Sequence, residues 1–261
     1  MGVESAKRGK FSRTSNYAWL IFVGCCMCAM SVMPLGVMIF GVYLLPLAAA
    51  TGTDIATASI YMTINGWGMA LTAIVWGWLF SRVKTNSRYR IICIAIAVFG
   101  VLGPLWNSVI APQLGIVGYY IGSGIFSLSG GSLMVMIPMT MISNWFAPNI
   151  RGKIFGIVSA SGIIGALSIP PLFTIVLQTT NLNVAFLLQA IIMGVFTIIP
   201  CAFIFRKRDE DVLPWGAKSW TEMENAEGTH AAKYGFPTKK ILITFPFWLL
   251  MLCQVTETLH G

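Results

Sequence analysis

Residues 115–146 read GIVGYYIGSGIFSLSGGSLMVMIPMTMISNWF, a stretch without a single Asp, Glu, Lys or Arg. A helix needs about 20 apolar residues to cross the hydrocarbon core of a bilayer, and this run exceeds that length. Its residues show no strict alternation of apolar and polar types, and a backbone crosses lipid only as a helix or in a closed barrel. The stretch therefore predicts a transmembrane helix.

Five other uncharged runs lie before and after this stretch, and a further one begins near the end of the sequence. The six predicted spans cover 17–47, 57–80, 91–110, 115–146, 154–177 and 184–205, and the seventh run starts around Ile241. The composition agrees, because 56% hydrophobic and 10% charged residues leave too little polar surface for a chain in water. We therefore predict an all-α membrane protein with a six-helix transmembrane bundle, the start of a seventh helix, and the lipid bilayer as its surroundings.

The positive charges predict how the helices are oriented. All 17 Lys and Arg fall on one side of a six-helix path, and they form five groups along the chain. The groups are Lys7, Arg8, Lys10 and Arg13; Arg82, Lys84, Arg88 and Arg90; Arg151 and Lys153; Arg206, Lys207 and Arg208; and Lys218, Lys233, Lys239 and Lys240. By the positive-inside rule this side is cytoplasmic. The net charge of +8 then reflects membrane topology, and no nucleic-acid partner is expected.

The same pattern divides the chain into four parts. We predict a cytoplasmic N-terminus over 1–16, the bundle over 17–206, a cytoplasmic linker over 207–240 and an incomplete seventh helix over 241–261. The first apolar run is much longer than the roughly 7–15 residues of a signal-peptide core, so we expect it to remain as a helix. Short loops without glycosylation sites favour a bacterial inner membrane as the location.

The reactive side chains argue against an enzyme. The chain has only two histidines, His230 and His260, and no carboxylate pair, nucleophile constellation or glycine-rich phosphate loop. Its six cysteines all lie in apolar segments, where neither a disulfide framework nor a zinc site is expected. We therefore expect no catalytic residue, no metal site and no cofactor.

Small residues and prolines distinguish several of the spans. Glycines cluster in the fourth and fifth spans, where they let helix backbones approach closely in lipid. Pro34, Pro138 and the pair Pro170-Pro171 each remove a backbone donor and bend a helix. Both features fit a transporter that rocks around a cavity, and both also fit a static bundle.

This arrangement resembles the N-terminal half of the major facilitator superfamily of secondary transporters, a twelve-helix fold. The resemblance implies that the six helices form inverted 3+3 repeats. Gly77 and Arg82 keep the spacing of the family signature in the loop between the second and third helices, and Lys84 adds to its basic cluster. Ser81 stands where the family has an aspartate, which is implied to form a cytoplasmic charge-relay latch. The resemblance therefore implies no latch of the usual kind here.

Two further segments are similar to particular members of this family. Gly156, Gly165 and Pro170 fall in register with part of the glycine-proline pattern in the fifth helix of family antiporters. Segments 144–156 and 213–216, which contain Asn-Trp-Phe and Leu-Pro-Trp-Gly, are similar to the oxalate/formate antiporter-like and monocarboxylate-transporter-like branch. That similarity implies a small organic anion as the substrate. The sugar-phosphate and nitrate branches share related loops and remain alternatives.

Polar groups in the spans that line the cavity of this family are candidates for contact with the solute. Asn65 lies near the middle of the second span, beside Trp67. Ser127 and Met134 are seven residues apart in the fourth span, a spacing that places both on one helical face. Packing and hydrogen bonds between helices are the alternative roles for these side chains.

Three more polar residues lie inside apolar runs. Glu257 is an acid within the seventh run, where a carboxylate suggests proton coupling or substrate contact unless it reaches the outer surface. Gln189 and Asn107 lie in the sixth and third spans, which are peripheral in the family, so we expect structural hydrogen bonds from both.

Two functions remain open from the sequence. The leading hypothesis is one half of a secondary active transporter, an antiporter or symporter that moves a small solute with a coupling proton or ion by alternating access. Because the chain stops inside an apolar run, we expect a fragment of a twelve-helix protein. The alternative is a non-transporting sensor or assembly partner with six or seven helices, whose small residues serve oligomerisation.

Overall fold

The computed structural model describes residues 2–83, 85–208 and 212–217, with side chains described from Tyr17 onward. The predicted seventh span and most of the predicted linker lie outside these residues. Within the described part, six helices are long and apolar enough to cross a membrane, which confirms the predicted all-α bundle.

Each of the six spans is a single helix or a continuous run of helical segments. Span 1 comprises α1 (Gly2–Met33), the π turn η1 (Pro34–Met38) and α2 (Phe40–Thr51); span 2 is α3 (Ile55–Arg82); span 3 is α4 (Asn86–Val109), followed by the short α5 (Ala111–Leu114). Span 4 comprises α6 (Ile116–Gly131), the π turn η2 (Ser132–Met136) and α7 (Ile137–Trp145); span 5 is α8 (Pro148–Thr179); span 6 comprises α9 (Leu182–Met193), η3 (Gly194–Ile198) and η4 (Pro200–Ile204).

The helices α4 and α8 begin several residues earlier than the uncharged runs predicted. The helix α4 starts before Arg88 and Arg90, and α8 starts before Arg151 and Lys153. Long basic side chains keep their charged groups in the headgroup region while their own backbone is helical. A search for uncharged stretches therefore misses the first turns of such helices.

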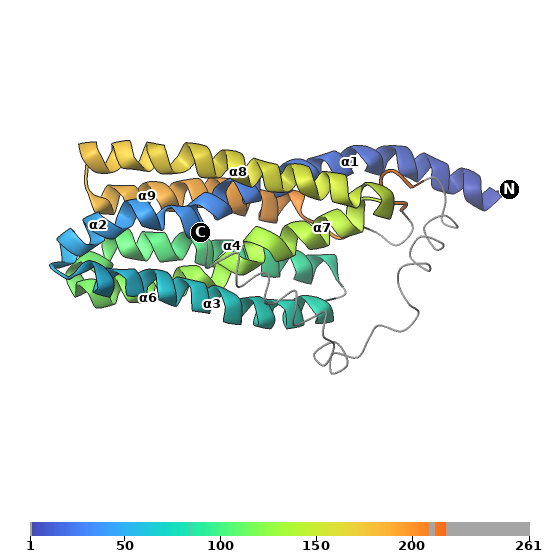
Figure 1. The fold of residues 1–261 in the computed structure, drawn as a ribbon. Helices are drawn as coiled ribbons and strands as arrows, with labels where there is room; N and C mark the ends of the chain where they lie inside the picture. The colour runs from blue at the N-terminus through green and yellow to red at the C-terminus, as the bar shows by residue number, and fades with distance from the viewer. Residues whose placement is uncertain (1, 84, 209–211, 218–261) are drawn as a thin grey trace, which may run out of the picture. The chain divides into compact units, whose positions relative to one another are not determined.

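The spans run along one common axis, with α8 and α9 on one flank and α3 and α6 on the other (Figure 1). One end of the bundle carries the connections after α3 and α7 together with Arg82, Arg151 and Arg206, and we call it the basic end. The other end, here the opposite end, carries the connections after α2, α4 and α8. The alternation of the spans thus brings the described basic clusters together.

Side-chain caps define where two spans start at the opposite end. The carboxylate of Asp54 accepts a hydrogen bond from the Thr57 N–H at 3.4 Å, and hydrogen bonding from Thr57 lowers the pKa of Asp54 below its ordinary value. The amide of Asn181 accepts from the Val184 N–H at 3.0 Å. These caps satisfy free N–H groups at the starts of α3 and α9.

Spans 1–3 and spans 4–6 repeat one pattern of burial. In the most apolar 18-residue window of each span, the buried share is 56% in span 1, 17% in span 2 and 39% in span 3, and the same three values recur in spans 4, 5 and 6. Spans 1 and 4 also each contain a π turn next to a proline, although the π turns η3 and η4 of span 6 have no counterpart in span 3. Because each triplet has an odd number of helices, the second triplet starts from the opposite end. This is the pattern that the inverted 3+3 arrangement implied by the family resemblance would produce.

Glycines allow the closest crossings between spans, as the small-residue clusters predicted. A Cβ on Gly103 would lie 2.7 Å from the backbone nitrogen of Phe126, where spans 3 and 4 cross. A Cβ on Gly131 would lie 2.9 Å from the carbonyl oxygen of Met69, where spans 2 and 4 cross. Real Cβ atoms do not approach backbone this closely, so these crossings require glycine.

Candidate functional site

Span 1 widens into the π turn η1 where Pro34 interrupts it. The Ile39 N–H donates to the Pro34 carbonyl oxygen, five residues earlier, at 2.8 Å. Proline has no N–H, so the carbonyl of Met30 lacks its usual donor within the helix. That carbonyl faces Gly165 of α8, where a Cβ would collide with it. The predicted bend at Pro34 is therefore a π turn close to a glycine crossing with span 5.

Two buried amide side chains bind the main chain of this turn. Asn65 of α3 donates from Nδ2 to the Gly36 carbonyl oxygen at 2.9 Å. Gln189 of α9 donates from Nε2 to the Leu35 carbonyl oxygen, also at 2.9 Å. The two side chains are only 3% and 2% exposed. Spans 2 and 6 therefore each hold one of two adjacent peptide groups of span 1.

The acceptor oxygens of the same amides are buried without a partner. Asn65 Oδ1 and Gln189 Oε1 make no hydrogen bond within the part of the chain that the structure describes. A buried polar atom in this state costs about 1–3 kcal/mol. A hydrogen-bond donor placed beside either oxygen would therefore stabilise the folded protein.

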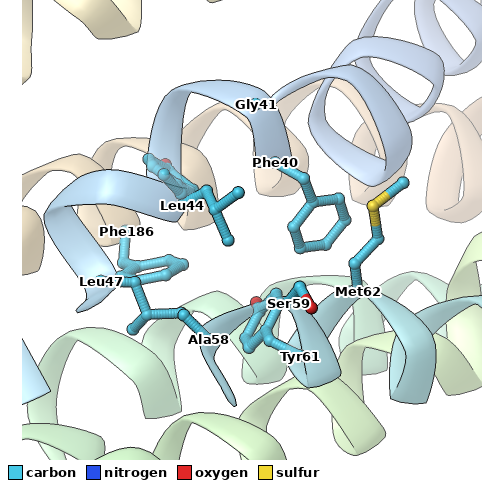
Figure 2. A pocket seen from close by; sticks show the side chains of 10 residues that line it. Phe40, Gly41, Leu44, Leu47, Ala58, Ser59, Tyr61, Met62 and Phe186 are labelled. Carbon is cyan, nitrogen blue, oxygen red and sulfur yellow. The ribbon is translucent and has the colours of Figure 1, made fainter. Parts of the chain in front are cut away.

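A small apolar cavity lies between α2 and α3 (Figure 2). Its volume is about 110 Å³, and the rings of Phe40 and Tyr61 pack at one wall with 5.0 Å between their centroids. Leu44, Leu47 and Met62 also line it, and no charged residue is among its lining residues. The cavity contains none of the predicted pathway residues.

Beyond span 6 the chain stays at the basic end of the bundle and packs against the connection between spans 4 and 5. The Trp215 N–H donates to the Trp145 carbonyl oxygen at 2.8 Å, and the Ala147 N–H donates to the Trp215 carbonyl oxygen at 3.0 Å. The Trp215 ring also packs edge-on against Trp19, with 5.1 Å between the centroids. We call residues 212–217 the return segment. The return segment contains residues 213–216, and its backbone bonds connect them to segment 144–156. These are the two segments that carried the second family resemblance.

Three consecutive basic residues before the return segment bind neighbouring spans. The guanidinium of Arg206 lies over the Tyr17 ring, 4.0 Å from its centroid. Lys207 Nζ donates to the carbonyl oxygen of Val83 at 2.5 Å, and Arg208 Nε donates to a carbonyl in the last turn of α7 at 2.7 Å. Cations favour the negative end of a helix dipole. These residues therefore stabilise the packing of the basic end as well as marking its charge.

Comparison with known protein families gives a match over most of the chain. The model of the Major Facilitator Superfamily matches residues 20–257. The chain belongs to the major facilitator superfamily. Members of this superfamily are transporters, so transmembrane transport of a solute is the function, and the chain is a multi-pass integral membrane protein. A search of the curated proteins found no match.

The predicted pathway residues of this major facilitator chain lie in different surroundings. Asn65 faces span 1, whereas Trp67 is 70% exposed. Ser127 is buried against Gly68 of span 2, and its hydroxyl donates to a carbonyl of its own helix. Met134 is half-buried within η2, where the wider turn alters the seven-residue spacing on which the shared face was predicted. Glu257 lies outside the described residues.

The described motif residues before the loop between spans 2 and 3 lie in the last turns of α3 and differ in their contacts. Gly77 is half-buried beside η2, and a Cβ there would lie 3.3 Å from a methionine methyl group. Ser81 is exposed and its hydroxyl donates to the Trp78 carbonyl oxygen at 2.7 Å, while the Arg82 guanidinium lies 3.9 Å from the Trp78 ring centroid. Lys84 lies outside the described residues.

The three motif residues of span 5 also differ in their contacts. Gly165 lies against the carbonyl oxygen of Met30, as described above, whereas Gly156 is exposed with open space around it. Pro170 is half-buried inside α8, which continues through it. Gly165 therefore packs against the turn of span 1, whereas Gly156 contacts no neighbouring span among the described residues.

Sequence reasoning missed the meeting of Asn65 and Gln189 on one turn. A structural hydrogen bond was expected for Gln189, and the structure confirms it, but the acceptor in span 1 was not foreseen. The available signal was an amide in an otherwise apolar run together with a proline in a neighbouring span. Neither one specifies which carbonyl is bound.

Replacing Gly165 with Ala should destabilise the bundle by about 1–3 kcal/mol, because the added Cβ collides with the carbonyl oxygen of Met30. Thermal unfolding in detergent, followed by tryptophan fluorescence, measures the effect. Gly156→Ala is the matched control in the same helix and should leave the midpoint unchanged or slightly raised, since its surroundings are open. Equal midpoints for the two variants would contradict the crossing described here.

Replacing Trp215 with Ala should release the return segment, because the ring anchors the backbone bonds to the 145–147 loop. We expect hydrogen–deuterium exchange at the Ala147 amide to rise by about fivefold, the loss of roughly 1 kcal/mol of local stability. Trp78→Ala, an exposed tryptophan at the same end, is the control and should leave that amide unchanged. No rise in the Trp215 variant would show that the segment holds without its ring.

Proposed function

We propose that the six spans form one half of a secondary active transporter that moves a small organic anion across the membrane by alternating access. The observation that carries this proposal is the repeated burial of spans 1–3 and 4–6, which fits an inverted 3+3 arrangement, in a member of the major facilitator superfamily. In this superfamily the solute site lies at the interface of repeats, and transport is a rocking motion around it.

Span 1 is the part of this bundle best suited to change shape. Its π turn divides it into α1, which packs on α8, and α2, which packs on α3 and α9. π turns cost hydrogen-bond geometry and recur at functional positions in helices. The proposed motion therefore places the bend of span 1 at Pro34–Met38, beside the glycine crossing at Gly165.

The choice of a small organic anion rests on the segments similar to the oxalate/formate antiporter-like and monocarboxylate-transporter-like branch. These segments pack against each other through the backbone of Trp215 at the basic end. The described interiors of the six spans contain amides and hydroxyls but no Lys or Arg. Helix dipoles and the remainder of the transporter would then supply the positive potential for an anion.

Uptake into proteoliposomes tests the transport proposal. The transporter with both of its halves is purified, reconstituted and offered radiolabelled oxalate, formate, lactate and pyruvate, once with an imposed pH gradient and once with unlabelled anion inside. Saturable uptake above that of protein-free liposomes is expected for at least one anion. Dependence on the pH gradient would indicate symport with protons, and dependence on internal anion would indicate antiport.

Two results would overturn parts of this proposal. Uptake of a neutral sugar with no uptake of any carboxylate would reject the anion class and keep the transporter. No uptake of any solute under either condition, from protein that unfolds cooperatively, would reject secondary active transport by this chain.

We also propose that the basic end is cytoplasmic, from the positive-inside rule, and that the membrane is the bacterial inner membrane, from the short loops without glycosylation sites. Labelling with a membrane-impermeant maleimide tests the orientation. In intact cells, Thr180→Cys at the opposite end should react and Asn149→Cys at the basic end should react only after lysis; both positions are exposed. The reverse pattern would contradict the orientation, and the wild-type chain, whose described cysteines are buried or half-buried, gives the background.

A further inference from the structure

Asn65 and Gln189 come from different spans and reach consecutive peptide groups within the π turn of span 1. Both bonds are 2.9 Å long and well inside the hydrogen-bond range. A side-chain donor stabilises the direction in which its acceptor carbonyl points, and the carbonyls of a π turn point differently from those of an α-helix. The two amides therefore favour the π form of this turn over the α form.

The acceptor oxygens add a second observation that points beyond packing. Asn65 Oδ1 and Gln189 Oε1 are both buried and have no partner within the described residues. Leu or Met would fill similar space without an unsatisfied polar atom of its own, but the carbonyls of Gly36 and Leu35 would then lose their side-chain donors. The fold accepts the cost of two unpaired oxygens in order to place two N–H donors on span 1.

We propose that Asn65 and Gln189 are positioning residues for the transport step, which hold span 1 in its π form and so set the rotation of α2 relative to α1. This inference rests on the proposed transport function. A π turn contains about one residue more than an α turn, so conversion to the α form would rotate the helix beyond it by roughly 100°. The amides thus control which face of α2 is directed to the core.

The packing of α2 shows what this rotation would change. Tyr43 and Leu47 now face the core, at 2% and 3% exposed, while Leu45 is 64% exposed. Tyr43 packs against Phe186 of span 6 with 4.6 Å between ring centroids. Rotation of α2 would withdraw these core side chains from span 6, and the wall of the cavity between α2 and α3 would change with them. Loss of the amide donors should therefore change the packing of α2 in particular.

Hydrogen–deuterium exchange in lipid nanodiscs tests the proposal with Asn65→Leu, Gln189→Met and the double variant. Each single change should raise exchange in the 34–51 segment by about fivefold, the equivalent of one lost hydrogen bond. The double variant should raise exchange in this segment by well below the roughly 25-fold product of the two single effects, because the first loss already opens the turn that both amides hold. Asn65→Ser is a second variant that removes the same hydrogen bond, because the serine side chain is too short to reach Gly36, and it should raise exchange in the same segment.

Asn107 provides a matched control. It is also a fully buried amide with an unpaired oxygen, but its Nδ2 donates to the Tyr61 hydroxyl at 2.8 Å and not to span 1. Asn107→Leu leaves both bonds to span 1 in place. It should therefore raise exchange in the 34–51 segment much less than Asn65→Leu does, even though the Tyr61 ring packs on Phe40, and it should combine multiplicatively with Gln189→Met. For an anion that the wild-type protein carries, the Asn65 and Gln189 variants should lower the maximal rate about fivefold or more with KM within about twofold.

The exchange experiment needs no substrate, so its outcome is independent of whether any of the anions is carried. Multiplicative effects of Asn65→Leu and Gln189→Met would overturn the proposal, because they would show two unrelated hydrogen bonds. Equal increases of exchange in all six spans would overturn it too, because they would show a general loss of stability. A rise confined to 34–51 with a less-than-multiplicative double variant would support it.

Discussion

The constraint on which this structure depends is that every backbone hydrogen-bonding group inside lipid must find a partner within the protein. Helices meet this requirement almost everywhere in the described chain, and prolines are where it fails. Pro34 leaves the Met30 carbonyl without its usual donor, and Pro200 does the same for Phe196. Phe196 is compensated by the thiol of Cys28, which donates to its carbonyl oxygen at 3.6 Å. The prolines therefore define where the spans must interact with one another.

Glycine and the amides are two different answers to the disturbance at Pro34, and only the amides supply hydrogen-bond donors. Where a freed carbonyl faces another helix, glycine lets the two backbones approach, as Gly165 does at Met30. Where the π turn redirects its carbonyls, long side chains carry donors to them, as Asn65 and Gln189 do. The first answer fixes the distance between two spans, and the second fixes the conformation of one of them. Span 1 uses both within a few residues, so its bend is determined by spans 2, 5 and 6 together.

The sequence was sufficient for the number, order and approximate bounds of the spans, because length and lack of charge are local properties. It also predicted the roles of glycine and proline, since their backbone effects follow from their chemistry. It could not place Gln189 against Leu35, because a contact between residues so far apart in sequence depends on how six helices pack. The π turns were equally hidden, since Pro34 is compatible with a simple kink. The seven-residue spacing of Ser127 and Met134 assumed an unbroken α-helix, and η2 removes that assumption.

The basic end was read from the sequence as a statement about topology alone, and its packing was not foreseen. Arg206, Lys207 and Arg208 bind an aromatic ring and helix carbonyls, because the chain after span 6 folds back on the bundle. Positive charge at these positions can have two physical effects: it sets the orientation of the helices under the positive-inside rule, and it interacts with the negative ends of helices. A pattern of charges alone does not separate the two.

The π turns of spans 1 and 4 differ in the hydrogen bonds that involve them. In span 4 the carbonyl of Met136 accepts a hydrogen bond from Thr140 of the same span, at 2.7 Å. In span 1 the donors come from spans 2 and 6. A change in the turn of span 4 can therefore keep its hydrogen bond, because donor and acceptor belong to one helix. A change in the turn of span 1 must break or carry along contacts with two neighbours. The repeated architecture thus assigns the more strongly coupled bend to span 1.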